Sequence, residues 1–146
     1  MPPLHHAAIC TTDLDHSRRF WQDGLGLSEF FDHEFSGEWP TLFGASTERL
    51  RSVFLGDPDH PDAGIVELVV FTDVDTQAKP ANAPRAGFFL LSFNVDVETT
   101  LQRLEGLGFA DGVRRIEVAS GRDRKVPMAV VRAPDGVLVE LIGPAR

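Results

Sequence analysis

Short apolar runs alternate with polar turns in the first half of the chain, and one longer stretch carries a helical stripe. A helix start at Thr12 or Asp13 is followed by apolar residues at roughly helical spacing, and glycines end the stretch. The strand-like runs cover residues 4–10, 28–35, 48–56 and 64–71. The first half is therefore predicted to follow the order β-α-β-β-β.

The second half repeats this order after a polar stretch without periodicity. Residues 87–95 read as a strand, and leucines at helical spacing follow at 101, 104 and 107. Three more strand-like runs cover residues 109–119, 125–133 and 136–143, and Pro134-Asp135-Gly136 is a hairpin signal before the last of them. The second half is also predicted as β-α-β-β-β.

Two short motifs indicate an internal duplication. Asp-Gly-Leu-Gly-Leu at 23–27 corresponds to Glu-Gly-Leu-Gly-Phe at 105–109, and a Val-Glu-Leu triplet falls in the last strand of each half. We predict an α+β fold with two tandem β-α-β-β-β modules that form a cupped, mostly antiparallel sheet with helices on the outer face. The modules cover about 1–72 and 87–146, with a linker at 73–86, within one domain of 1–146.

The two triplets place Glu67 and Glu140 inside otherwise apolar strands. Burying an unpaired carboxylate costs several kcal/mol, so each glutamate needs an arginine or lysine, a metal ion, a substrate or a proton. One interpretation is a structural salt bridge to an arginine on a neighbouring strand, for which Arg49, Arg51 and Arg132 are the candidates. The other is a functional site on the face of the sheet away from the helices.

Composition narrows the classes of partner. The chain has 146 residues, 42% of them hydrophobic, and a net charge of −8, which argues against nucleic acid because phosphate binding needs clustered cations. No run approaches the ~20 apolar residues of a membrane helix. The single cysteine, Cys10, fits a reducing compartment and a small core position. We expect a soluble, cytoplasmic protein with a small-molecule ligand, bound neither to nucleic acid nor to membranes.

The opening HHAAICTTDLDHSRRFWQDGLGL and the ending APDGVLVELIG resemble those of the vicinal oxygen chelate superfamily. That superfamily includes glyoxalase I, extradiol dioxygenases, methylmalonyl-CoA epimerase, fosfomycin-resistance enzymes and bleomycin-binding proteins. The resemblance covers nearly the whole chain in the same order. It implies paired β-α-β-β-β modules with open, cupped sheets, assembled as a homodimer with sites between modules.

The resemblance also implies four strand positions that hold a divalent ion in metal-dependent members. Three of these positions fall on His6, Glu67 and Glu140. The remaining one, a histidine in the family, falls on Leu90 when the strand is matched and on Phe89 when the helix start is matched, and neither side chain binds a metal. The cofactor implied is Ni, Zn, Mn, Mg or Fe, or none where the missing ligand has abolished the site.

The donor set separates the reactions of the superfamily. Iron that activates dioxygen generally uses two histidines and one carboxylate, whereas this chain offers one histidine and two carboxylates, so an extradiol dioxygenase is disfavoured. The first hypothesis is a glyoxalase-like or epimerase-like lyase or isomerase of a small carbonyl or hydroxy-acid, with Glu140 or Glu67 as the catalytic proton carrier. The alternative is a metal-free binding or sequestering protein of the bleomycin-resistance type.

Four further residues are predicted to contact the substrate. Ser92 and Asn94 share the face of Leu90, although polar residues near a sheet edge also occur without a ligand. Trp39 and Phe43 lie in the segment 36–47, which is too apolar for an ordinary surface loop. This loop is predicted either to cover the cup with an aromatic wall or to form a dimer contact.

Overall fold

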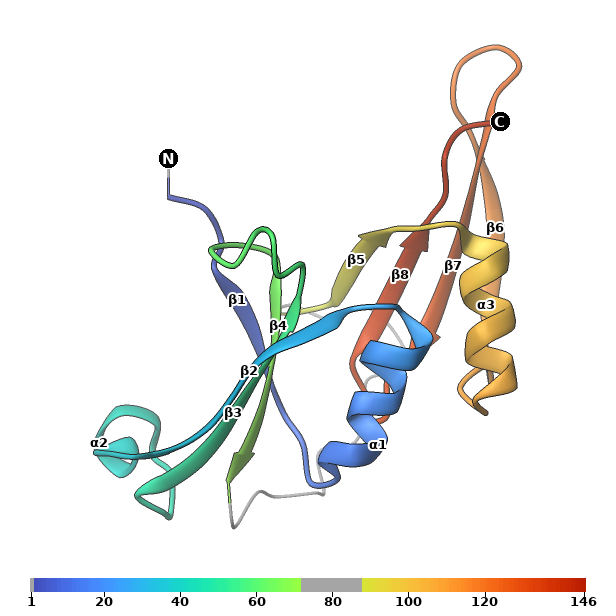
Figure 1. Ribbon diagram of the computed structural model, residues 1–146. Helices are drawn as coiled ribbons and strands as arrows, with labels where there is room; N and C mark the ends of the chain where they lie inside the picture. Colours follow the sequence, from blue (N-terminus) through green and yellow to red (C-terminus); the bar gives the residue numbers. More distant parts are fainter. Residues whose placement is uncertain (1, 72–87) are drawn as a thin grey trace. The chain divides into compact units, whose positions relative to one another are not determined.

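The computed structural model describes residues 2–71 and 88–146, and the predicted linker at 73–86 lies outside them. Two compact units divide the chain, one with strands β1 to β4 and one with strands β5 to β8 (Figure 1). Each unit follows the predicted β-α-β-β-β order around its own four-stranded mixed sheet, so the α+β fold class is confirmed. No helix within these two ranges is long and apolar enough to cross a membrane.

The first unit arranges its sheet in the order β1-β4-β3-β2. Its strands are β1 (His6–Cys10), β2 (Ser28–Ser36), β3 (Arg49–Gly56) and β4 (Ile65–Phe71). β1 runs parallel to β4, while β4 with β3 and β3 with β2 are antiparallel. A crossover therefore brings the first and the last strand of the unit side by side (Figure 1).

The crossover helix begins as predicted and ends differently. The Asp13 carboxylate caps α1 (Leu14–Arg18) by accepting from the backbone N–H of His16 at 3.0 Å. The chain then widens into a π-helix, η1 (Arg19–Gly24), closed by a bond from Leu25 N to Phe20 O at 3.0 Å. The wide turn accommodates the adjacent rings of Phe20 and Trp21, both fully buried. The predicted apolar stripe is therefore buried at Phe20, Trp21 and Leu25, but a π-helix, which was not predicted, carries its second half.

The core of the first unit lies between these helices and one face of the sheet. Val53, Leu55 and Leu68 point to the helix side and are fully buried. Because side chains alternate along a strand, their neighbours on β3 and β4 point to the other face. That second face carries Ser52 and Glu67.

The segment predicted as a loop between the second and third strands contains a short helix, α2 (Trp39–Phe43). Pro40 occupies its first turn, where no backbone donor is needed, and Gly44 ends it at a φ of 67°, a left-handed conformation that favours glycine. The helix fixes Trp39 and Phe43 on one side because residues four apart share a helix face.

The second unit has the sheet order β5-β8-β7-β6, with β5 parallel to β8. Its elements are β5 (Leu90–Asn94), α3 (Val97–Gly106), β6 (Arg114–Ala119), β7 (Lys125–Arg132) and β8 (Leu138–Ile142). Leu104 of α3 and Val131, Val139 and Leu141 of the sheet are almost fully buried, which places the core of this unit on their side. Glu140 alternates with Val139 and Leu141 and points to the opposite face.

Candidate functional site

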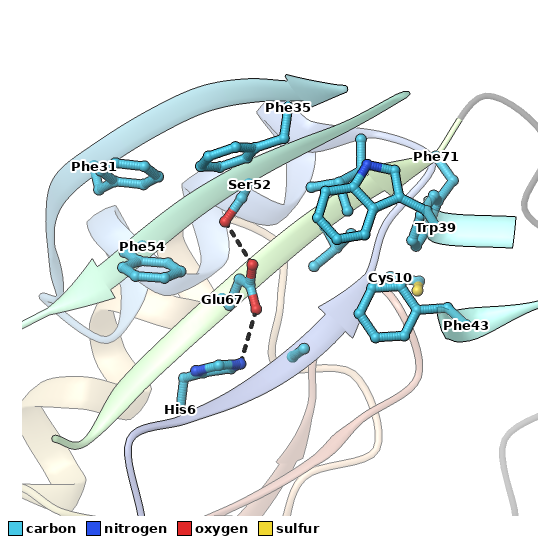
Figure 2. Close-up of a pocket in the computed structure, with 13 residues that line it drawn as sticks. His6, Cys10, Phe31, Phe35, Trp39, Phe43, Ser52, Phe54, Glu67 and Phe71 are labelled. Carbon is cyan, nitrogen blue, oxygen red and sulfur yellow. Dashed lines mark hydrogen bonds and ion pairs between the residues drawn. The ribbon is translucent and has the colours of Figure 1, made fainter. Parts of the chain in front are cut away.

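One face of the first sheet is hollowed into a cavity of about 740 Å³ (Figure 2). Alternate residues of β1, β3 and β4 form its floor, and β2, α2 and the end of β4 supply aromatic walls. The lining residues are His6, Ala8, Cys10, Phe31, Phe35, Trp39, Phe43, Leu50, Ser52, Phe54, Glu67, Val69 and Phe71. Of the residues predicted as site residues, His6, Glu67, Trp39 and Phe43 come together here.

Glu67 is the central polar group of the cavity, and each of its oxygens has a partner (Figure 2). Ser52 Oγ donates to Glu67 Oε1 at 2.5 Å. His6 Nε2 lies 3.1 Å from Glu67 Oε2, and the side chains of His6 and Glu67 are 39% and 14% exposed. The carboxylate is therefore held in one orientation while it faces the cavity.

His6 is itself oriented by its neighbour in the chain. The Nδ1 atoms of His5 and His6 lie 2.8 Å apart, so one of the two rings donates to the other. His6 also stacks on Phe54, with ring centroids 5.9 Å apart and an angle of 27° between the planes. Both contacts fix the His6 ring, so that its Nε2 atom points to Glu67.

The prediction that Glu67 forms a structural salt bridge with Arg49 or Arg51 is wrong. Arg49 pairs with Glu34 at 3.2 Å, and Arg51 pairs with Asp32 at 2.7 Å. The two arginines alternate along β3 with Leu50, Ser52 and Phe54, which line the cavity, so they lie on the other face of the sheet.

The ion pairs on that other face form a network that joins α1 to the β2–β3 hairpin. Arg18 donates to Glu29 at 2.8 Å and to Asp32 at 2.9 Å. The hydrogen bond from Arg51, followed by that from Arg18, holds the pKa of the Asp32 carboxyl well below its usual range, at about 2. Hydrogen bonding to Glu29 raises the pKa of Arg18, and hydrogen bonding to Asp32 raises that of Arg51.

Glu140 lies in the second unit and has a different partner. Ser92 Oγ donates to Glu140 Oε2 at 2.8 Å. A small depression of about 160 Å³ adjoins Glu140, lined also by Arg114, Ile116, Met128, Ala129 and Val130. Asn94, the other residue predicted on this face, is exposed near the end of β5 and does not line that depression. Arg132, the third candidate for a salt bridge, donates to the backbone oxygen of Gly136 at 2.9 Å.

The strand register identifies the residue that corresponds to His6 in the second unit. Ala8 of β1 pairs with Glu67, and Ser92 of β5 pairs with Glu140. His6 lies two residues before Ala8, and Leu90 lies two residues before Ser92. Leu90 therefore occupies the position of the missing histidine, whereas Phe89 precedes the strand.

The donor atoms of His6 and Glu67 fit a divalent ion as a pair. Two ligands at a right angle, each roughly 2.1 Å from an ion, lie about 3 Å apart. The 3.1 Å between His6 Nε2 and Glu67 Oε2 is compatible with this length and equally with a direct hydrogen bond between the two groups. Within residues 2–71 and 88–146, however, no group of three or more His, Cys, Asp or Glu side chains is placed to hold an ion.

Sequence reasoning missed part of the cavity. Ser52 and the rings of Phe31, Phe35, Phe54 and Phe71 were not predicted as site residues, although all line it. The signal for Phe31 and Phe35 is their alternation within SEFFDHEFS, where aromatic residues on one face oppose Asp32 and Glu34 on the other. For Ser52, the signal is a polar residue on the same face of β3 as Leu50 and Phe54.

Comparisons with known proteins agree on the class of fold. A glyoxalase family protein from Bacillus cereus matches with a TM-score of 0.71 at 21% identity, over 98% of this chain and 94% of that one. A glyoxalase I from Leishmania major, described as trypanothione-dependent, matches with a TM-score of 0.61 at 20% identity, over 98% and 87%. A chain of two β-α-β-β-β units that matches these structures is a glyoxalase-fold protein.

The family follows from the sequence match. The model of the Glyoxalase/Bleomycin resistance protein/Dioxygenase superfamily matches residues 3–141, and the chain belongs to this superfamily. A relative from Aspergillus terreus, lactoylglutathione lyase-like protein terB, is 33% identical over 145 residues, which are 95% of this chain and 74% of the relative. The resemblance to the vicinal oxygen chelate superfamily is thus confirmed.

Proposed function

We propose that the chain is a lyase or isomerase that moves a proton on a small carbonyl substrate, with Glu67 as the proton carrier. The observation that carries the proposal is the position of Glu67, a carboxylate with a partner on each oxygen, facing a cavity with largely apolar walls. The similarity to a protein named lactoylglutathione lyase-like supports the same class of reaction.

The chemistry proposed for Glu67 is a balanced proton transfer. The substrate carries a hydroxyl on the carbon next to its carbonyl. The carboxylate takes the C–H proton of that carbon, and the electron pair of the C–H bond forms an enediolate. Glu67 then returns the proton to the neighbouring carbon while the hydroxyl proton moves to the former carbonyl oxygen, which gives the isomer. Return of the proton to the opposite face of the original carbon, once the intermediate has turned in the cavity, gives the epimer. Neither outcome needs an oxidant or a reductant.

Ser52 and His6 are proposed to position this carboxylate. Ser52 donates to Oε1 of Glu67 and the His6 ring lies at Oε2, so rotation of the Glu67 carboxyl group is restricted. This restriction keeps one lone pair of the carboxylate directed at the substrate. The apolar walls would exclude water once a ligand covers them, and electrostatic interactions are stronger in a dry site.

A divalent ion fits this proposal as a cofactor. His6 and Glu67 would hold it, and when bound it would polarise the substrate carbonyl and stabilise negative charge on its oxygen. The sequence-based prediction that Glu140 contributes to the same ion stays a prediction.

The aromatic walls of the cavity also favour the alternative function, a binding protein of the bleomycin-resistance type. Exposed rings hold a ligand by stacking and do not require a reaction. The two functions differ in whether Glu67 changes the substrate or only contacts it.

Deuterium exchange distinguishes these functions. The chain is incubated in D₂O with hydroxyacetone and with phenacyl alcohol, and NMR follows deuterium entering the carbon next to the carbonyl. We expect wild-type protein to accelerate exchange of at least one compound and Glu67→Gln to lose roughly 100- to 10,000-fold of that acceleration. Glu105→Gln, at an exposed position of α3, is the matched control and should behave as wild type.

Two results would contradict the proton-transfer function. One is exchange by Glu67→Gln at the wild-type rate. The other is tight binding of these compounds by the wild-type chain without any exchange, which would favour the binding protein. Both variants are checked for wild-type circular dichroism and melting temperature, so that a loss of activity is not a loss of fold.

A further inference from the structure

From the walls of the cavity we infer that its substrate is an uncharged compound with a planar aromatic ring beside the reacting carbonyl, and not a glutathione conjugate. The carbonyl part of this inference rests on the proposed function. The aromatic and uncharged parts rest on the cavity alone.

Two groups of rings flank the polar centre of the cavity (Figure 2). On one side Phe31 lies 5.0 Å from Phe54 and 6.0 Å from Phe35, measured between ring centroids. On the other side Trp39 and Phe43 stack with 5.7 Å between centroids and 12° between planes. Aromatic pairs prefer centroid separations of about 4.5–7 Å, so a ligand ring that enters the cavity finds suitable neighbours on either side.

Several of these rings keep much of their surface exposed to the cavity and the solvent. Phe31, Phe35 and Phe43 are 36%, 37% and 60% exposed. Exposed rings gathered around one hollow are unusual for a surface without a ligand, because burying them is favourable. A flat apolar group is the shape that covers them.

The position of the rings relative to Glu67 places the reacting carbon next to the aromatic group. Phe54 is the register partner of Glu67 on the adjacent strand, and Phe31 packs against Phe54. His6 already stacks on Phe54, so a ligand ring would pack against the exposed part of Phe31, beside Phe54 and His6. A carbonyl attached to that ring would then lie on the side of the carboxylate. An aryl hydroxyketone has this arrangement of groups.

The charge of the cavity argues against anionic ligands. Among the described residues that line it, none is lysine or arginine, and Glu67 contributes a carboxylate. A glutathione conjugate carries two carboxylates and one ammonium group, and these carboxylates would find no lysine or arginine side chain in this lining. The relative from Aspergillus terreus is named for similarity to a lyase of such a conjugate, so the cavity predicts a different substrate for this chain.

Four probes test the inference by isothermal titration calorimetry at one pH and salt concentration, with a chelator present so that a divalent ion at His6 and Glu67 does not attract the carboxylate probes. Phenacyl alcohol is the uncharged aryl hydroxyketone, and hydroxyacetone lacks the ring. Benzoylformate carries a carboxylate in place of the hydroxymethyl group, and S-lactoylglutathione is the conjugate. We expect phenacyl alcohol to bind most tightly, and each of the other three to bind roughly tenfold more weakly or worse.

Matched variants on α2 test the contribution of the rings. Phe43→Leu keeps an apolar side chain but removes the ring, and Trp39→Leu does the same at the other stacked position. Each should weaken phenacyl alcohol binding roughly 2- to 12-fold, the value of one aromatic contact. Leu42→Ala lies on the same short helix, is 68% exposed and does not line the cavity, so it should bind as wild type.

The results separate this inference from the proposed function. Tighter binding of benzoylformate or S-lactoylglutathione than of phenacyl alcohol, or wild-type affinity in both ring variants, would overturn the inference even if Glu67-dependent exchange is observed with hydroxyacetone. Preferential binding of phenacyl alcohol with loss in the ring variants would support the aromatic, uncharged ligand even if no exchange occurs, and then only the proposed reaction fails.

Discussion

Asp32 offers a quantitative test of how the cavity wall is supported. Its carboxylate accepts hydrogen bonds from Arg51 at 2.7 Å and from Arg18 at 2.9 Å, on the face opposite Phe31. These bonds lower the pKa of Asp32 from 3.8 to about 2. One pKa unit corresponds to about 1.4 kcal/mol, so the depression amounts to roughly 2 kcal/mol. Because the side chain is 30% exposed, screening by solvent reduces the expected stabilisation to about 1 kcal/mol.

The pH dependence gives this prediction its sign. A depressed pKa in the folded state stabilises the fold above the unfolded pKa, and the stabilisation is lost as the pH falls through the folded pKa. Asp32→Asn should therefore lower the free energy of unfolding by about 1 kcal/mol at neutral pH, and the difference from wild type should shrink as the pH falls from about 4 to about 2.

Urea unfolding followed by tryptophan fluorescence measures this effect in the first unit, because both tryptophans, Trp21 and Trp39, lie there. Glu105→Gln, a carboxylate removed from an exposed position of the second unit, controls for the change in net charge. Equal stability of Asp32→Asn and wild type at neutral pH would refute the reasoning. So would a difference that stays constant down to about pH 2.

Three further outcomes are expected. Protein purified without chelator should contain divalent metal, measured by elemental mass spectrometry, and His6→Ala or Glu67→Gln should lower the affinity for that metal at least roughly tenfold. Unchanged metal content in both variants would refute His6 and Glu67 as metal ligands. Glu140→Gln tests whether the second unit also contributes a ligand. A Cβ on Gly143 would lie 2.6 Å from the proline ring of β7, so Gly143→Ala should lower the free energy of unfolding by about 1–3 kcal/mol, measured by urea unfolding followed by circular dichroism. The control Gly106→Ala in α3 meets no atom within 4 Å and should be neutral or stabilising. Equal effects of the two variants would contradict this packing. The homodimer expected from the family resemblance should appear by light scattering, and a monomer at micromolar concentration would count against it.

The order of strands and helices could be predicted because each depends on local patterns. Strand alternation around Glu67 and Glu140, and the capping residue Asp13, are visible within a few residues of the chain. Strand ends were less accurate: β1 begins at His6 and not at Leu4, and β6 begins at Arg114, well after Phe109. These ends depend on hydrogen bonds to neighbouring strands, which a single sequence does not display.

The partners of Glu67 could be predicted only in part. His6 followed from the family resemblance, but Ser52 reaches Glu67 from an adjacent strand whose register no short motif reveals. Whether Glu67 pairs with a structural arginine or with a functional partner depends on which face of β3 carries Arg51. The pairing of Arg51 with Asp32 shows that this arginine lies on the face opposite Glu67. Long-range register is the information that the local pattern lacks.

The two units share one backbone arrangement but contain two different carboxylate sites. The strand registers superimpose Glu67 on Glu140 and His6 on Leu90, and they also place Ser92 at the position of Ala8. In the first unit an imidazole therefore faces the carboxylate together with the Ser52 hydroxyl, whereas in the second unit the hydroxyl of Ser92, on the neighbouring parallel strand, takes the place of the imidazole. An imidazole can bind a metal or carry a proton, but a serine hydroxyl without a base does neither readily. The acid-base chemistry is accordingly expected to be concentrated in the first unit, where the aromatic cavity also lies.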